Sequence, residues 1–394
     1  MTVATIWAAC FCFPTVWIIT GIGEPDKPFL DLRGLISASD TLRLGGSPHV
    51  SNPLDPYHRV HAYSDWWLVL GRLGITGNDL AWVGVVLLLA FLAVAVLQNR
   101  PATGREGCDL LLVLVSPSLL MAAHRANNDL VAFVLMGIAL HWLRGKRTLL
   151  RASAILLLAL SAALKYFPMA AAVLLLEART RRELASWIVL YAGVLLLAWP
   201  SMQRGLGFAS AHAPAPAGLY AFGAPMIFRD LGLASATGVG QLAAGALLAV
   251  GALLWWPRAA DRAPAATPVI PAPEFLCGAA MVAGCFLHGS SYLYKLIFAL
   301  WLLPWLWGRA PGPGDARSRR VIWWLLLAVL WFDGAIAIII NLTVNFAGLP
   351  PAAGVRLLEA ALIAGQLLTW AFIACLWRPM VIQVAGLLRR WVPA

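Results

Sequence analysis

Charged residues are scarce in this chain of 394 residues. Asp, Glu, Lys and Arg make up 12% of it, whereas hydrophobic residues make up 61%, well above the share in a soluble domain. Apolar runs recur along the whole length, which excludes an ordinary soluble protein. The sequence predicts an all-α, polytopic membrane protein with about 10–12 transmembrane helices, in a single integral membrane domain that covers residues 1–394.

Several motifs are missing as well. The six cysteines include no CxxC pair, so neither a disulfide framework nor a zinc site is indicated. The chain has no Walker loop, no Gly-rich dinucleotide fingerprint and no HExxH motif. We predict no cofactor, although a divalent metal stays open. The net charge of +11 lies in short loops rather than on one basic surface, so we predict no nucleic-acid partner.

Apolar runs set the expected helices and their orientation. We expect helices at 4–22, 77–98, 109–123, 129–143, 150–164, 166–177, 184–200, 233–256, 274–290, 294–308, 321–342 and 356–377. With a cytoplasmic N-terminus, most Lys and Arg fall in the inner loops, as the positive-inside rule requires. The prediction is a multi-pass protein of the plasma (inner) membrane, with long outer loops at about 23–76 and 201–232 and an active site that faces the outer side.

The first outer loop begins with an expected helix. Apolar residues recur at helical spacing from Leu32 to Leu42, which predicts an amphipathic interfacial helix lying on the membrane surface. The acid at its start, Asp31, is a functional candidate. In the alternative interpretation Asp31 only caps the helix, while Arg33 and Asp40 form a solvated pair.

Turn-forming residues, histidines and aromatics follow in "GGSPHVSNPLDPYHRVHAYSDWW". The spacing of His49, His58 and His61 matches no compact ligand pattern, so no metal site is predicted. Tyr63 and Trp66 are candidates to stack on a sugar. The alternative is that such aromatic residues only anchor the protein at the membrane interface.

Three cations stand in tight polar turns between apolar runs: Arg125 in "HRANND", Lys165 in "LKYFP" and Lys295 in "SYLYKLIF". Convergence of three outer cations suggests a site for a lipid phosphate. The alternative is that each cation snorkels to the headgroups. Further candidate substrate contacts beside these cations are His124, Asn128, Asp129, His288 and Tyr294.

Asp333, in "WFDGAIAIII", is the acid placed most deeply in an apolar run. A carboxylate within a membrane is a functional candidate by default. It supports a different hypothesis, a transporter or flippase for a lipid-linked sugar or related solute. No convincing internal repeat accompanies it, although transporters often have one. A third hypothesis is a structural subunit of an envelope complex.

The ordered segments "FLDLRGLISASDTLRLGGSPH", "YSDWW", "HRANNDLVAFVL", "ALKYFPMAAAVLLL" and "SYLYKLIFALWLLP" resemble the polytopic GT-C glycosyltransferases. The likeness is to glycosyltransferase family 87, which includes polyprenyl-phosphate mannosyl- and arabinofuranosyltransferases. The resemblance implies transfer of a sugar from a polyprenyl-phosphate donor to a lipid-linked or glycan acceptor on the outer face. It also implies a catalytic base in the first outer loop, which falls on Asp31, with Asp40 and Asp55 as the next candidates.

The expected chemistry uses both kinds of charge. A carboxylate takes the proton of the acceptor hydroxyl while the anomeric carbon is attacked, and cations stabilise the departing phosphate. We predict an inverting hexosyl- or pentosyltransferase in which Arg125, Lys165 and Lys295 bind the donor phosphate.

Overall fold

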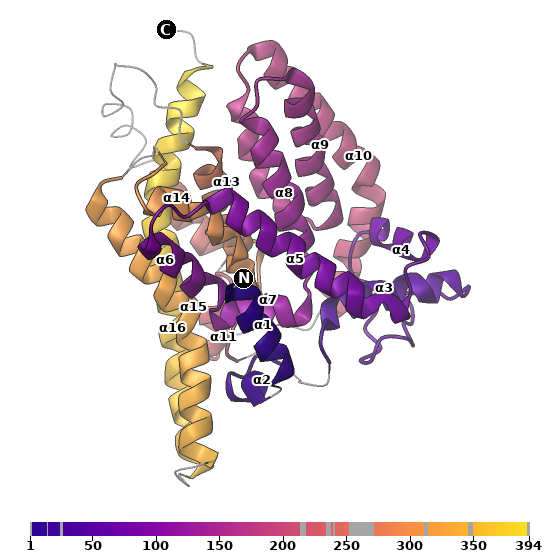
Figure 1. The fold of residues 1–394 in the computed structure, drawn as a ribbon, viewed down its shortest axis with the longest axis vertical. Coiled ribbons are helices and arrows are strands. Elements are labelled where there is room, and N and C mark those ends of the chain that lie inside the picture. Colours follow the sequence, from indigo (N-terminus) through magenta and orange to yellow (C-terminus); the bar gives the residue numbers. More distant parts are fainter. Residues whose placement is uncertain are drawn as a thin grey trace. The chain divides into compact units, whose positions relative to one another are not determined.

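The computed structural model describes residues 2–13, 15–23, 27–212, 218–233, 238, 241–251, 272–310, 314–345 and 350–391. These residues fold almost entirely into helices (Figure 1). They belong to two compact units, each built from separate stretches of the chain. The Asp31 unit comprises Asp26–Gln98 and Ala122–Ala215, and the Lys295 unit comprises Met1–Pro25, Asn99–Met121 and Pro216–Ala394.

In the Asp31 unit, two helices pack against a third one, α9 (Thr148–Leu164). The elements are α3 (Leu30–Arg43), η1 (Asp65–Leu68), α4 (Val69–Arg72), η2 (Gly77–Asp79), α5 (Leu80–Asn99), α8 (Asp129–Leu143), α9 (Thr148–Leu164), η3 (Phe167–Glu177) and α10 (Arg181–His212). Helix α9 packs against both α8 and α10, and Figure 1 shows the three side by side. Ala and Leu favour helix in α9. Its buried residues Ala154, Leu158 and Ala162 recur every four positions on one face.

Helix α3 is buried on two faces, which corrects the expectation of a solvated polar face. Its apolar residues Leu32 and Leu35 are buried, and so are the polar residues Asp31, Ser39 and Asp40. The hydroxyl of Ser39 donates a hydrogen bond to the η1 backbone and accepts one from the α4 backbone. The helix itself is present as predicted, but its polar residues contact protein.

The Lys295 unit is also helical, with one short strand pair. Its elements are α1 (Thr2–Cys12), α2 (Thr15–Ile19), α6 (Gly104–Leu114), β1 (Ala221–Phe222), α11 (Met226–Asp230), α13 (Pro273–His288), β2 (Ser291–Tyr292), η5 (Leu293–Leu302), α14 (Leu303–Leu306), α15 (Ala316–Asn345) and α16 (Pro351–Arg389). The strands are antiparallel, with Ala221 opposite Tyr292. Helix α15 packs along α16, and α13 packs on η5 and α16. Helix α7 (Pro117–Arg125) begins in this unit and ends in the Asp31 unit.

Within the described part of the chain, four helices are long and apolar enough to cross a membrane. They are Gly77–Asn99, Arg181–Ala209, Ala316–Val344 and Gly354–Arg389. A fifth candidate is the pair α6 and α7, which is bent by 57°. The other apolar helices have 10–17 residues. The chain is therefore an all-α, multi-pass membrane protein, and the larger number of spans stays a prediction.

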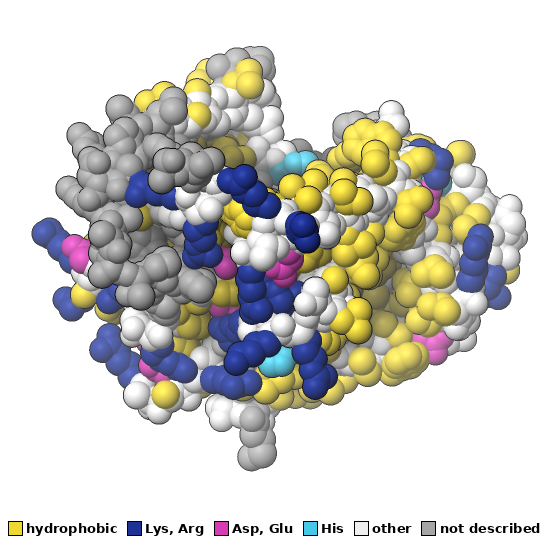
Figure 2. Space-filling view, turned by 90° about the horizontal axis from the view of Figure 1, so that it is seen from above, with side chains coloured by type: hydrophobic (Ala, Val, Ile, Leu, Met, Phe, Trp, Pro, Cys, Tyr) yellow, Lys and Arg dark blue, Asp and Glu magenta, His cyan; other side chains and the backbone are white. Residues whose placement is uncertain are grey.

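Apolar side chains cover much of the visible surface in Figure 2. In α5 the exposed residues include Trp82, Val85, Leu89 and Leu97. Exposed apolar surface on this scale is costly in water and is the expected exterior of a helix that contacts lipid.

Several expected boundaries change. The predicted helix 4–22 is divided into α1 and α2. Helix α10 continues to His212, so residues 201–212 of the expected outer loop 201–232 are helical. Helix α10 is longer because it continues through Pro200, which lies inside the helix and does not end it. The predicted helix 233–256 lies mostly outside the described residues, apart from an apolar helix at Gln241–Gly251.

Candidate functional site

The carboxylate of Asp31 is buried among cationic and amide side chains. Arg125 donates to it at two points, from Nε to Oδ2 (2.9 Å) and from Nη2 to Oδ1 (2.7 Å). Asn127 Nδ2 donates to Oδ2 (2.5 Å), and Arg59 Nη1 lies 3.5 Å from Oδ1. Only 6% of the Asp31 side chain is exposed, against 20% for Arg125. The two-point pair fixes the orientation of both side chains.

A backbone contact brings these side chains together. Phe29, which precedes α3, has a positive φ of 59°, and its N–H donates to the carbonyl oxygen of His124 (2.6 Å). This bond joins the beginning of α3 to the end of α7, so Asp31 faces Arg125. The Asp31 side chain bonds across to another segment, and the alternative that it caps its own helix is wrong.

The partners of Asp31 keep it ionised. Burial raises the pKa of this carboxyl, but the charge of Arg125 and its hydrogen bond, with the charge of Arg59 and the bond from Asn127, lower the pKa to about 2. Asp31 is therefore a carboxylate at neutral pH. Its proton affinity stays low as long as Arg125 is bound to it.

A second ion pair forms around Lys165, at the end of α9. Its Nζ lies 2.6 Å from Asp129 Oδ1 and donates to Asn127 Oδ1 (2.8 Å) and to Asn128 Oδ1. The ring centroid of Tyr63 lies 5.6 Å from the same Nζ, within reach of a cation–π contact. The carboxylate of Asp129 balances the ammonium charge.

Asn127 connects the two ion pairs. Its amide nitrogen donates to Asp31, while its amide oxygen accepts from Lys165 and from the backbone N–H of Asp129 (2.9 Å). The sequence analysis did not assign this residue, although it stands in the "HRANND" motif. The buried group formed by Asp31, Arg59, Arg125, Asn127, Asp129 and Lys165 is called the Asp31 cluster below.

Arg59 is the other member that the sequence analysis missed. It pairs with Asp55 through Nη2 to Oδ1 (2.7 Å) and Nε to Oδ2 (3.0 Å), and it donates to the carbonyl oxygen of Leu30 (2.8 Å). Burial raises the pKa of Asp55, but the hydrogen bonds and charge of Arg59 lower it below its usual range. The i, i+4 spacing of acid and base in a turn-rich segment was the available signal. The pair fastens this loop over the start of α3.

The carboxylate of Asp40, a second candidate base, is held by contacts within the protein. Its carboxylate accepts from the backbone N–H of Gly77 (2.9 Å) and pairs with Arg43 at 3.2 Å. The alternative interpretation, in which Arg33 pairs with Asp40, is therefore wrong, because the partner of this acid is Arg43, one helical turn away. Tyr63 is half-buried beside the cluster. Burial, followed by the charges of Asp31 and Asp129, raises the pKa of the Tyr63 hydroxyl above its usual range.

Three candidates belong to the Lys295 unit. Lys295 is buried in η5 with its Nζ 5.7 Å from the ring centroid of Tyr294, and His288 ends α13. Their convergence with Asp31 stays a prediction.

Asp333 serves the packing of the Lys295 unit. Its Oδ2 accepts from the backbone N–H of Tyr220 (2.7 Å), whose hydroxyl donates to the carbonyl oxygen of Thr20 (2.6 Å). The bond satisfies a buried backbone donor beside β1, which is a structural use of the carboxylate.

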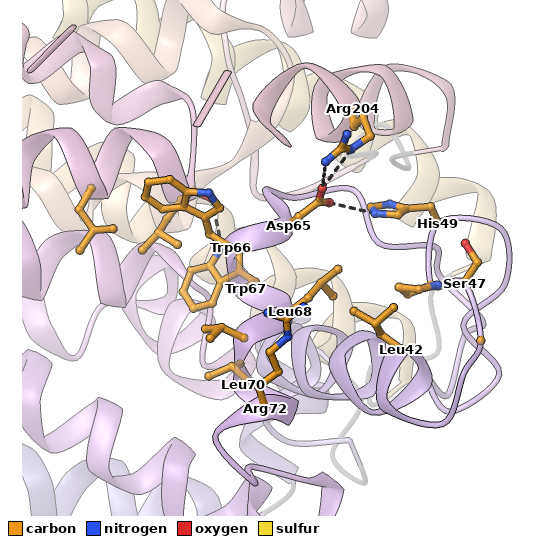
Figure 3. A pocket seen from close by; sticks show the side chains of 15 residues that line it. Leu42, Ser47, His49, Asp65, Trp66, Trp67, Leu68, Leu70, Arg72 and Arg204 are labelled. Carbon is orange, nitrogen blue, oxygen red and sulfur yellow. Dashed lines mark hydrogen bonds and ion pairs between the residues drawn. The ribbon is translucent and has the colours of Figure 1, made fainter. Parts of the chain in front are cut away.

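A pocket of about 900 Å³ opens elsewhere in the Asp31 unit. Figure 3 shows Asp65 held between Arg204 and His49, with Trp66 and Trp67 on another side. Arg204 Nε donates to Asp65 Oδ2 (3.0 Å), and His49 Nε2 lies 2.9 Å from Asp65 Oδ1. Trp66, a predicted sugar contact, therefore lines a pocket, whereas Asp31, Arg125 and Lys165 do not line it.

Comparison with family models, curated proteins and solved structures gives no match. The site therefore has to be interpreted from its own geometry. Among the described residues, no group of three or more His, Cys, Asp or Glu side chains is arranged to hold a metal ion. The Asp31 cluster offers a carboxylate with two guanidinium groups at its more exposed edge, 20% and 29% exposed for Arg125 and Arg59. Such an arrangement can bind an anion next to a proton acceptor.

Proposed function

We propose that this protein is a membrane glycosyltransferase with a GT-C-like architecture. It transfers a sugar from a polyprenyl-phosphate donor to a lipid-linked or glycan acceptor, with inversion at the anomeric carbon and Asp31 as the base. The observation that carries the proposal is the Asp31 cluster, in which an ionised, 6% exposed carboxylate lies beneath two more exposed guanidinium groups. The order of motifs in the sequence supports the same class.

The proposed reaction is a single displacement. The acceptor oxygen attacks the anomeric carbon and forms the new glycosidic bond, while the bond from that carbon to the phosphate oxygen breaks. The electron pair of the broken bond leaves with the polyprenyl phosphate, and the acceptor proton goes to Asp31. The leaving group is a stable phosphate anion, so it needs charge stabilisation rather than a proton.

In this proposal Arg125 couples donor binding to base strength. Its guanidinium is the main group that, with Arg59 and Asn127 and against the effect of burial, lowers the pKa of Asp31 to about 2 in the free protein. A donor phosphate that approaches from the exposed side competes with Asp31 for Arg125, since guanidinium binds phosphate and carboxylate in the same two-point manner. When Arg125 turns to the phosphate, the proton affinity of Asp31 rises at the moment when the acceptor hydroxyl needs a base.

Lys165 has a different proposed role. Because Asp129 and two asparagine side chains already hold its ammonium, Lys165 positions Asn127, which in turn orients Asp31. Lys295 remains the third predicted phosphate contact.

The proposed setting is the plasma (inner) membrane, with the Asp31 cluster facing the outer side. The support is the concentration of Lys and Arg in the loops predicted to be cytoplasmic. A lipid-linked donor fits a protein that exposes apolar helices such as α5, because donor and enzyme then share the bilayer. Polyprenyl-phosphate sugars and the acceptor are the proposed partners.

The test is transfer by the purified full chain in lipid nanodiscs. Incubation with polyprenyl-phosphate mannose or arabinofuranose and a lipid-linked glycan acceptor should release polyprenyl phosphate and form a product of inverted configuration. The Lys295→Ala variant should raise the donor KM more than it lowers kcat, since the predicted contact is to the donor phosphate.

Transport is the competing outcome. In that outcome the chain releases no polyprenyl phosphate from any such donor but moves the lipid-linked sugar between the leaflets of a liposome, and the Asp333→Asn variant stops that movement. The protein is then a flippase, and the proposal is wrong.

A further inference from the structure

The pocket in Figure 3 has a polar side and an apolar side. Its polar side carries Asp65, His49, Arg204 and Arg72, supplied by η1, the preceding loop, α10 and α4. Figure 3 shows Arg204 and Arg72 entering from opposite sides. The pocket is thus built from segments that are far apart in sequence but belong to one unit.

The pocket is lined by more positively than negatively charged side chains. Asp65 is the only carboxylate among the described residues that line the pocket, and Arg204 already pairs with it. Arg72 also lines the pocket, and within the described part of the chain it has no hydrogen-bond or ion-pair partner. Two guanidinium groups against one carboxylate leave an excess positive charge, so the polar side attracts an anion. In the Asp31 cluster, by contrast, the three cations face carboxylates within salt-bridge distance.

The remaining walls are hydrocarbon and indole. They are formed by Leu42, Trp66, Trp67, Leu68, Val69, Leu70, Leu160 and Leu164. Leu160 and Leu164 stand one turn apart on α9 and present one continuous apolar face. Trp67 is fixed against this face, because its Nε1 donates to the carbonyl oxygen of Leu164 (3.0 Å). A pocket of about 900 Å³ with such walls accommodates part of an alkyl chain.

We propose that this pocket binds the phosphate and adjoining chain of a lipid phosphate, with the phosphate between Arg72 and Arg204 and the chain along Leu160 and Leu164. Guanidinium groups suit a phosphate because their N–H donors match its oxygens in pairs. The site is separate from the Asp31 cluster. The inference goes beyond the proposed function and stands whether or not the chain transfers a sugar.

The experiment uses the purified full chain in nanodiscs of phosphatidylcholine and a photoactivatable hexadecyl phosphate. Crosslinks located by mass spectrometry should fall on α9 and the segment from η1 to α4. Unlabelled hexadecyl phosphate should compete, whereas hexadecanol and inorganic phosphate should each compete at least about tenfold less well, since each lacks one half of the ligand.

Variants test the two cations. Arg72→Gln and Arg204→Gln should each weaken labelling by about tenfold, the effect of losing one charge-assisted contact. Arg72→Gln is the safer variant for folding, because its side chain is exposed and has no partner in the described residues. The matched control is Arg43→Gln, an exposed arginine of α3 that does not line the pocket, and it should label like the wild type.

Three outcomes would overturn the inference. Inorganic phosphate that competes as well as the alkyl phosphate would indicate a site for free anions. Equal competition by hexadecanol would indicate a purely apolar pocket. Unchanged labelling in both the Arg72→Gln and Arg204→Gln variants would remove the proposed phosphate contact.

Discussion

Single side chains in the Asp31 unit carry charges that their neighbours compensate. Asp31 faces Arg125 and Arg59, while Asp129 faces Lys165. Burying any one of these charges without its partner would cost on the order of several kcal/mol. Each charged side chain therefore depends on its partners for its stability in the folded protein. Asn127 carries no charge but contacts both ion pairs. The cluster is therefore one connected polar network.

His61 gives the Asp31 unit a distinct dependence on pH. The pKa of this imidazole is lowered to about 4. Burial and the nearby His49 lower it by more than the carbonyl of Ser64 and the charge of Asp65 raise it. The pKa of a histidine in an unfolded chain is about 6.5. Because the folded pKa is the lower one, the unfolded chain binds more protons between these values. Stability is therefore full above about pH 6.5 and falls as the pH drops toward about 4.

The His61→Gln variant tests this dependence. Acidification from pH 7 to pH 5 should lower the free energy of unfolding by about 2 kcal/mol more in the wild type than in the variant. Thermal unfolding in detergent at the two pH values measures the difference. His141→Gln, at an exposed position, is the control and should keep the wild-type slope. An identical slope in the His61→Gln variant would contradict a buried neutral imidazole.

Helices α3 and α4 approach so closely that only glycine fits between them. The hydroxyl of Ser39 accepts from the N–H of Gly71 (2.6 Å) and donates to the carbonyl oxygen of Leu68 (2.7 Å). A Cβ at Gly71 would lie 2.9 Å from both the carbonyl oxygen and the Oγ of Ser39. This contact holds α4, and with it Arg72, against α3.

The Gly71→Ala variant should therefore be destabilised by about 1–3 kcal/mol, the usual cost of forcing extra volume into a packed contact. Its melting temperature in detergent, relative to wild type, is the measurement. Gly193→Ala is the matched control in α10, where an added Cβ would meet nothing within 4 Å. This control should be unchanged or more stable, because Ala favours helix over Gly. Equal effects of the two substitutions would show that α3 and α4 do not meet at Gly71.

Elements were easier to predict than contacts. The apolar runs indicated where most helices lie, since a stretch of helix-forming apolar residues has few alternatives in a membrane. Which polar side chains meet was harder, because partners such as Asp31 and Arg125 are 94 residues apart. The sequence grouped Asp31 with Arg125, Lys165 and Lys295; hydrogen bonds connect the first three through Asn127, and the place of Lys295 stays a prediction. It did not foresee that Asn127 and Arg59 would complete the network, or that Asp65 would line a pocket.

At the scale of the whole molecule, the polarity of the chain explains both its location and its proposed chemistry. Its 61% hydrophobic residues supply the helices that expose apolar side chains, while its few charges concentrate in loops and in the Asp31 cluster. A lipid-linked donor suits this distribution, because a membrane-embedded enzyme can bind a substrate held in the same bilayer. The proposed base, Asp31, belongs to that cluster.

The most direct measurement is the transfer rate of the Asp31→Asn variant in nanodiscs, with donor and acceptor saturating. We predict a fall in kcat of about 10²–10⁴-fold, the contribution of a positioned base. Asp40→Asn, whose carboxylate bonds to Gly77 and Arg43, should keep near wild-type kcat once correct folding is verified by its melting temperature. A folded Asp31→Asn variant that transfers sugar at the wild-type rate would show that Asp31 is not the base.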